Sequence, residues 1–146
     1  MIRVDEVRER IEGRVPALAG QIGNAGEFAK LVEANQLPQR AKGGFVLPGS
    51  ISGGSRQAIS GMFTQAIAET VLVVLTVRVA SDPTGQRALD EITPLVRDVV
   101  AAVCGYSPAD APGVFALARG ELVGAAQGML IYQLDFTLDD QLRITP

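Results

Sequence analysis

The sequence has no histidine and a single cysteine among its 146 residues. Without histidine, neither a Ser-His-Asp triad nor a Cys-His pair can be built, and the commonest metal ligand and general base near neutral pH is missing. The single cysteine, Cys104, cannot form a disulfide within the chain, which suits a reducing compartment. We expect Cys104 to be a small buried thiol. Carboxylates or lysines remain the alternative means of catalysis.

The sequence also lacks a long apolar run, a signal-peptide core and an excess of basic residues. Arg78 interrupts the longest apolar stretch before it reaches the roughly 18–20 residues that a membrane helix needs. The first residues are charged, unlike the start of a secretory signal. The net charge is −3 and the pI is about 4.9, which argues against a dedicated nucleic-acid binder. We therefore expect a cytoplasmic protein.

Two local patterns resemble chemical motifs but fail their requirements. The segment 49–56 is rich in glycine and serine, but it does not end in the Gly-Lys-Ser/Thr of a phosphate-binding loop. It also lacks the Gly-x-Ser-x-Gly of a nucleophile elbow. Asp139 and Asp140 are adjacent carboxylates without further ligands, and we expect them in a solvated turn. No catalytic, cofactor-binding or metal-ligating residue is predicted.

The run of residues 70–80 predicts a central strand, because it is β-branched and apolar and contains neither glycine nor proline. One face, by the period of two of a strand, is apolar throughout and carries Val71, Val73, Leu75, Val77 and Val79. The other face begins apolar and turns polar at Thr76 and Arg78. We expect the strand to be covered on both faces at its start and on one face at its end.

Two amphipathic helices are predicted before this strand. Residues 2–14 carry apolar side chains at helical spacing: Val4, Val7 and Ile11. A second helix follows Asn24, which together with Glu27 forms the pattern of a capping box. This helix extends to about Asn35.

A third helix is predicted after the central strand, where Asp82 can cap it. Its apolar stripe, Leu89, Ile92, Val96, Val99, Val100 and Val103, predicts a helix that covers the core. Pro94 lacks an N–H, so we expect a kink or a late helix start there.

Further segments predict strands. Residues 16–22 suggest a short, weak strand, and 43–48 a short strand ended by Pro48. Residues 114–123 and 129–138 predict an antiparallel hairpin. The order of elements predicts a single α+β domain over residues 1–146, with a mainly antiparallel sheet and helices packed largely on one face.

The segment 49–63 is predicted to be a long, mobile hairpin or a partner-binding loop that acts in assembly. Its glycines and serines make it costly to order alone, whereas docking on a partner offsets that cost. The candidate interface residues in it are Ile51, Arg56, Gln57, Met62 and Phe63. Arg78 is a sixth candidate, which we expect to emerge at the end of the sheet and pair with an acidic residue of the same or a neighbouring subunit.

Several ordered features resemble a known family. An amphipathic first helix precedes a short strand at 44–48, and a segment with Gln57 leads into the long valine-rich strand. The sequence Gly105-Tyr106-Ser107-Pro108 occupies the place of a Gly-Trp-x-Pro pattern, with tyrosine in place of tryptophan. A late hairpin ends in Asp135-Phe136 with Arg143 nearby. The chain resembles the tail terminator proteins of tailed phages, in the Mu-like prophage branch with the lambda-like terminator fold.

This resemblance implies a structural virion protein, not an enzyme, without a cofactor. Such proteins form a ring, usually a hexamer, that caps the tail tube, stops its polymerisation and presents the docking surface for the head. The implied partners are further copies of the chain, the tail tube protein and the head-tail connector protein. Genome DNA would pass through the lumen without specific binding, and no membrane would be involved. The implied location is the head-proximal end of the virion tail, after assembly in the host cytoplasm.

Two alternatives remain open from the sequence. The first is another phage neck or head-completion connector protein, which would share ring formation but contact different partners. The second is a small cytosolic enzyme that uses carboxylates or Cys104. An enzyme would need a deep pocket with convergent polar groups.

Overall fold

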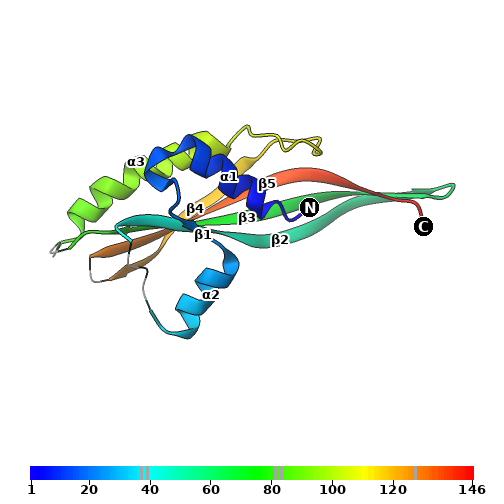
Figure 1. Ribbon diagram of the computed structural model, residues 1–146. Helices are drawn as coiled ribbons and strands as arrows, with labels where there is room; N and C mark the ends of the chain where they lie inside the picture. The colour runs from blue at the N-terminus through cyan, green and yellow to red at the C-terminus, as the bar shows by residue number, and fades with distance from the viewer. Residues whose placement is uncertain (37, 39, 81, 83, 127) are drawn as a thin grey trace.

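A computed structural model describes residues 1–36, 38, 40–80, 82, 84–126 and 128–146. In these residues, three α-helices accompany a five-stranded sheet of order β1-β2-β3-β5-β4 (Figure 1). The first pair of strands is parallel and the others are antiparallel. The elements are α1 (Val4–Arg14), a 3-10 turn (Pro16–Leu18), β1 (Ile22–Gly23), α2 (Ala25–Glu33), β2 (Lys42–Ile59), β3 (Met62–Arg78), α3 (Gln86–Val103), β4 (Ala116–Ala126) and β5 (Met129–Ile144).

The strand β3 lies in the middle of the sheet and contains the predicted central strand. All five side chains of the predicted apolar face are buried: Val71, Val73, Leu75, Val77 and Val79. On the other face, Val74 and Thr76 are also buried, and Arg78 is half-buried. The alternation in the sequence therefore identified the core side of the sheet correctly.

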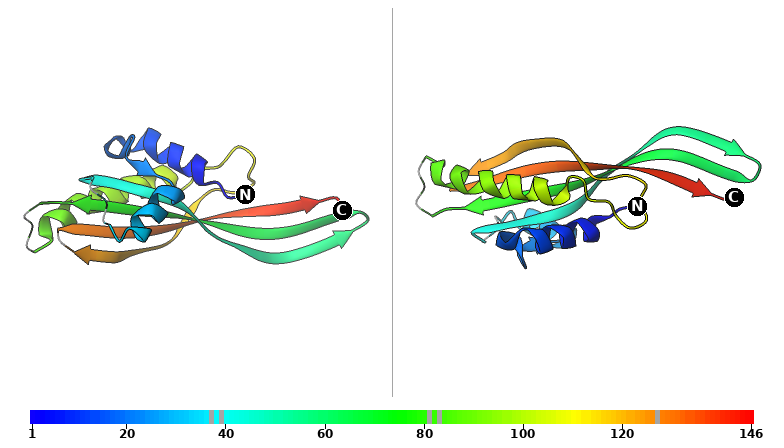
Figure 2. Two further views of the ribbon diagram at one scale, coloured as in Figure 1. Left: turned by 60° about the horizontal axis from the view of Figure 1, so that its bottom comes forward. Right: turned by 90° about the horizontal axis from the view of Figure 1, so that it is seen from above.

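The helices cover the two faces of the sheet unequally (Figures 1 and 2). Helices α1 and α3 pack on the face of Val73, through buried residues such as Val7 and Ile92. We call this the α1/α3 face. Helix α2 lies on the opposite face, the α2 face, where the Phe28 ring meets the Phe45 ring with centroids 5.3 Å apart. The sheet therefore carries helices on both faces rather than a single helical layer.

The predicted caps occur in the structure. The Asn24 side chain accepts a hydrogen bond of 2.9 Å from the backbone N–H of Glu27, as the capping box requires. The Asp82 carboxylate accepts one of 2.9 Å from the N–H of Ala88 in the first turn of α3. Ser81 and Pro83, which belong to the predicted turn, lie outside the described residues. Helix α3 runs through Pro94 and already begins at Gln86, so the proline does not delay it.

The largest difference from the sequence prediction is in β2. The predicted short strand and the loop that follows it form one strand of 18 residues, Lys42–Ile59, paired with β3 along its length. Pro48 does not end this strand, because β1 pairs only as far as Phe45 and no strand needs the missing N–H of Pro48. The predicted strand at 16–22 was wrong up to Gln21, because Pro16–Leu18 form a 3-10 turn and β1 begins only at Ile22.

Beyond the helices, β2, β3 and β5 continue as a three-stranded projection (Figure 2). We call this projection the arm and define it as residues 49–68 and 139–144. The part that carries the helices is the body. Gly49 lies where the arm leaves the body, and a Cβ there would approach the carbonyl oxygen of Thr70 to 2.6 Å. Glycine therefore permits the close approach of β2 to β3 at this position.

Substitutions in α3 test how the helix covers the core. Ile92 is 3% exposed, so Ile92→Ala should lower the free energy of unfolding by about 2–5 kcal/mol through a cavity. The expected burial of Leu89 was wrong, because its side chain is 49% exposed. Leu89→Ala should therefore change stability by about 0.5 kcal/mol. Urea denaturation of both variants measures the contrast, and equal losses would contradict this orientation of α3.

Candidate assembly surface

The arm ends in a tight hairpin turn at Ser60-Gly61. Both residues have positive φ, 39° and 81°, and Ile59 pairs directly with Met62. This combination is the type I′ turn of a two-residue hairpin, whose twist matches that of the flanking strands. The segment is therefore a β-hairpin, one of the two predicted alternatives, whereas the prediction of a loop was wrong for residues 49–59 and 62–63.

The α1/α3 face of the sheet continues onto the arm without a helix above it (Figure 1). Pairing places Ile51 and Phe63 on this face, together with Ile144 of β5. Ile51 is 43% exposed and Ile144 is 49% exposed. The arm thus presents apolar side chains that the body of the same chain does not cover.

The opposite face of the arm carries a second apolar site at the tip. Ile59 and Met62 form a cross-strand pair and are 66% and 50% exposed. On the same face, Gln57 and Thr64 form the next cross-strand pair, and Arg143 lies beside Thr64. An exposed apolar pair bordered by polar side chains is typical of a surface that contacts another protein.

Five of the six predicted interface residues, all except Arg78, are brought together on the arm. They divide between its faces: Ile51, Arg56 and Phe63 on one, and Gln57 and Met62 on the other.

Arg78 lies at the opposite end of β3, roughly 50 Å from the tip at about 3.3 Å per residue. Its guanidinium donates a hydrogen bond of 3.5 Å to the carbonyl oxygen of Pro38. Among the described residues, no carboxylate lies within ion-pair distance of Arg78. Its pairing across subunits stays a prediction.

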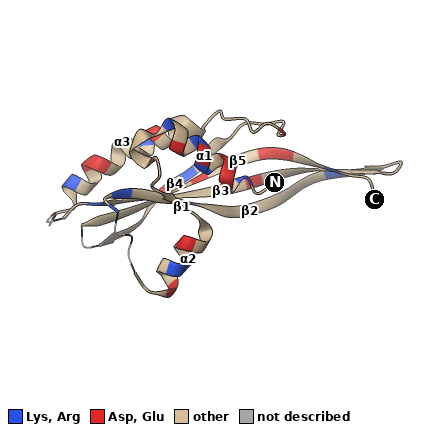
Figure 3. Ribbon diagram, viewed as in Figure 1, with Lys and Arg blue, Asp and Glu red and all other residues tan. Residues whose placement is uncertain are grey.

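A buried ion cluster fixes the base of the arm. The Arg3 guanidinium lies 3.0 Å from Glu69 Oε2 and 3.0 Å from Asp140 Oδ2, and a third carboxylate, Asp110, is 3.4 Å away. Arg3 is 5% exposed and Glu69 only 1%. Asp140 therefore lies in β5 opposite Ile67, and the prediction that it lies in a solvated turn was wrong. Figure 3 shows acidic residues gathered beside the start of α1.

The charges of this cluster favour the cationic form of Arg3. Burial alone would lower the pKa of its guanidinium, but the hydrogen bond and charge of Asp140 act against burial, together with the charges of Asp110 and Glu69. The pKa of Arg3 consequently lies above its ordinary value. The cluster therefore ties the start of α1 to β3 and β5 where the sheet leaves the helical layer.

Sequence reasoning missed several residues of this surface. Ser60-Gly61 between two apolar residues was a hairpin signal, and it would have placed Ile59 beside Met62. A charged Glu69 directly before the apolar strand was a signal of a buried ion pair. Arg3 gave no signal, because its partner Glu69 is 66 residues away in the sequence.

Neither a metal centre nor a membrane helix is found in the part of the chain that the structure describes. No group of three or more His, Cys, Asp or Glu residues there could hold a metal ion. No helix there is long and apolar enough to cross a membrane. Cys104 is half-buried at the end of α3 and packs against the core.

The fold defines a class of protein: an α+β body with a projecting β-sheet arm whose apolar side chains, Ile51, Ile59 and Met62 among them, are exposed. The chain matches the family model of the phage tail terminator protein over residues 1–146, and it belongs to this family. The family comprises structural phage tail proteins and is not a class of enzymes. Membership implies association with other tail components and a place in the virion tail. No curated protein matches the sequence.

Proposed function

We propose that copies of this chain form a ring, hexameric by resemblance, that caps the tail tube at its head-proximal end. The ring stops tube polymerisation and presents the surface on which the head-tail connector docks. Genome DNA passes through the lumen without specific binding, which the net charge of −3 favours. We also propose that the chain belongs to the Mu-like branch with a lambda-like fold, on the order of its resembling features; Tyr106 departs from the branch pattern, which has tryptophan there.

The observation that carries this proposal is the uncovered arm. A ring requires two different surfaces on each copy, so that each copy binds the next head to tail. The arm projects from one end of the body, and its exposed apolar residues, Ile51 and Met62 among them, are suited to a surface on another chain. Covering them removes apolar area from water, which stabilises the assembly by roughly 25 cal/mol per Å².

Single substitutions on the arm test the proposal. Ile51→Ser and Met62→Ser alter side chains that are 43% and 50% exposed, so the free chain should stay folded with nearly unchanged stability. Loss of about 1.4 kcal/mol per contact should raise the concentration at which rings form about tenfold. Sedimentation measures ring formation, and complementation of a terminator-deficient phage measures tail length.

The matched control is Val114→Ser, because Val114 is 51% exposed but lies outside the arm. This variant should form rings and tails of normal length. Arm variants that assemble as well as the control would contradict the proposal. Tails of normal length that fail to join heads would indicate a neck or head-completion protein instead.

A further inference from the structure

A buried hydroxyl on the α2 face has no hydrogen-bond partner. Thr76 is 2% exposed, and its Oγ1 is unpaired in the described structure. A buried polar atom without a partner costs free energy, whereas valine would fill the same space without that penalty. A ligand that supplies the missing hydrogen bond would therefore stabilise this part of the chain.

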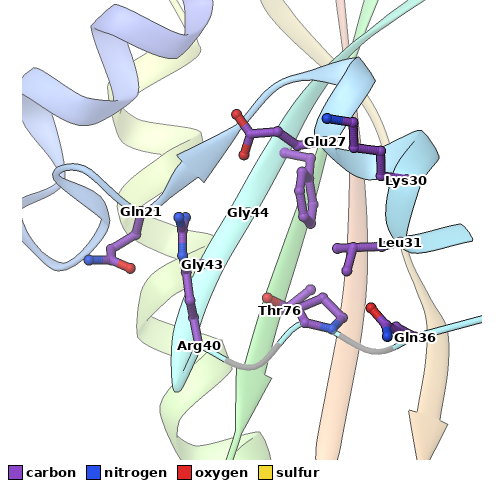
Figure 4. A pocket seen from close by; sticks show the side chains of 11 residues that line it. Gln21, Glu27, Lys30, Leu31, Gln36, Arg40, Gly43, Gly44 and Thr76 are labelled. Atoms are coloured by element: carbon purple, nitrogen blue, oxygen red, sulfur yellow. The ribbon is translucent and has the colours of Figure 1, made fainter. Parts of the chain in front are cut away.

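Thr76 lines a pocket of about 330 Å³ between α2 and β2. Figure 4 shows Thr76 and Gln36 near one end of the pocket, with Glu27 and Lys30 at the other. The aromatic ring of Phe45 and the side chain of Leu31 supply apolar walls. A second hollow of about 350 Å³ is also lined by Leu31 and Thr76, so Thr76 borders both.

The rim of the pocket carries more positive than negative charge. Lys30 and Arg40 line it from α2 and from the segment before β2, and both are exposed. Within the described ranges, neither cation has a carboxylate within ion-pair distance. Glu27 is the single acidic residue among the lining residues, which leaves an excess of one positive charge. This rim favours a ligand that carries carboxylates.

We propose that the pocket binds a peptide segment of a partner protein in which a tyrosine is flanked by acidic residues. The tyrosine ring enters between Leu31 and Phe45, its hydroxyl pairs with Thr76 Oγ1, and the flanking carboxylates lie beside Lys30 and Arg40. An aromatic ring with a terminal hydroxyl matches a pocket with apolar walls and a polar group at one end. The pocket lies on the body, at a distance from the arm residues that the ring proposal uses, so the two sites are tested by different variants.

Binding is tested with three short peptides on the full chain labelled with ¹⁵N. The probes are acetyl-Glu-Tyr-Glu-amide, acetyl-Glu-Phe-Glu-amide and acetyl-Gln-Tyr-Gln-amide. The first should cause saturable NMR shifts around Phe45 and Thr76. The phenylalanine peptide should bind about fivefold more weakly, because it lacks one hydrogen bond. The glutamine peptide should also bind more weakly, and its affinity should not depend on salt.

Two variants test whether Thr76 causes the difference in affinity between the tyrosine and phenylalanine peptides. Thr76→Val should raise Tm by about 3 °C and abolish the difference between the tyrosine and phenylalanine peptides. Thr76→Ser should retain that difference, because it keeps the hydroxyl. Equal affinity of the two peptides for the native chain would overturn the proposal, as would a Thr76→Val variant that still prefers tyrosine. Ring formation by the same samples is a separate measurement, so failure of the pocket and failure of the ring are distinguishable.

Discussion

Shortening β2, β3 and β5 of the arm together should leave a folded body that no longer assembles. Deleting residues 52–58 and 63–68 joins Ile51 to Ile59 and Met62 to Glu69, and residues 141–144 of β5, which pair with 63–66, are deleted with them. The pairs Ile51–Glu69 and Ile59–Met62 then become adjacent in the ladder, and the Ser60-Gly61 turn is kept. Glu69 also keeps its contact with Arg3, so the body should retain its core.

The expected phenotype of this short-arm variant is large. If the arm supplies most of the contact between copies, its loss should weaken ring formation roughly a hundredfold or more, which corresponds to about 2.7 kcal/mol, and infectious particles should fall as a result. Tubes in a terminator-deficient phage complemented with the variant should be overlong by electron microscopy. A deletion of Ser50–Ser55 alone is less informative, because it removes residues from β2 but not their partners in β3.

A control retains the arm but changes its turn. Ser60→Asn creates the Asn-Gly pair that type I′ turns favour, so the hairpin should form as well as in the native chain. This variant should support normal tails. A short-arm variant that forms rings and caps tubes like the control would show that the arm is not the assembly element.

Removing the cation at the base of the arm should produce the largest loss of stability. Arg3→Met leaves Glu69 and Asp140, with side chains 2% and 12% exposed, without their shared positive partner. Uncompensated buried charge typically costs about 3–5 kcal/mol, a large part of the roughly 5–15 kcal/mol that stabilises a domain. Urea denaturation should therefore show a much lower midpoint. The double variant Arg3→Met/Glu69→Leu should recover part of this loss.

An exposed ion pair on the same helix provides the comparison. Arg8 lies 3.5 Å from Asp5, but the two side chains are 32% and 81% exposed. Because such pairs are screened by solvent, Arg8→Met should cost about 0–1 kcal/mol. Equal losses for Arg3→Met and Arg8→Met would mean that the buried cluster does not hold the start of α1 against the sheet.

The sequence predicted those parts of the fold that depend on neighbouring residues. The alternation at 70–80 and the cap at Asn24 are local patterns, and both were found as expected. The extension of β2 beyond Pro48 was not predictable in this way. Its glycines and serines favour a loop, and the strand forms because β3 pairs with it over its whole length. The face on which α2 lies depends on which sheet surface remains uncovered, and the helix itself does not encode that.

The candidate surface was predicted in part for the same reason. Five of its residues lie within the segment 49–63, so the composition of that one segment was enough to predict them. Ile144 comes from the far end of β5 and joins them only through its pairing with Phe63. Arg3, Glu69 and Asp140 come from three separate elements, and only the folded chain brings them together.

The irregular edge of β2 has a consequence for the free chain. In the arm this strand has no outer neighbour, and its pairing with β3 shifts register after Pro48 and again after Gly53. Bulges, proline and a charged residue such as Arg56 make an edge a poor template for adding further strands. The edge of the arm is therefore a poor site for fibre growth, and the contacts between copies that we propose would use its faces instead. A structural tail protein with such an edge is protected against edge-to-edge aggregation while it is free.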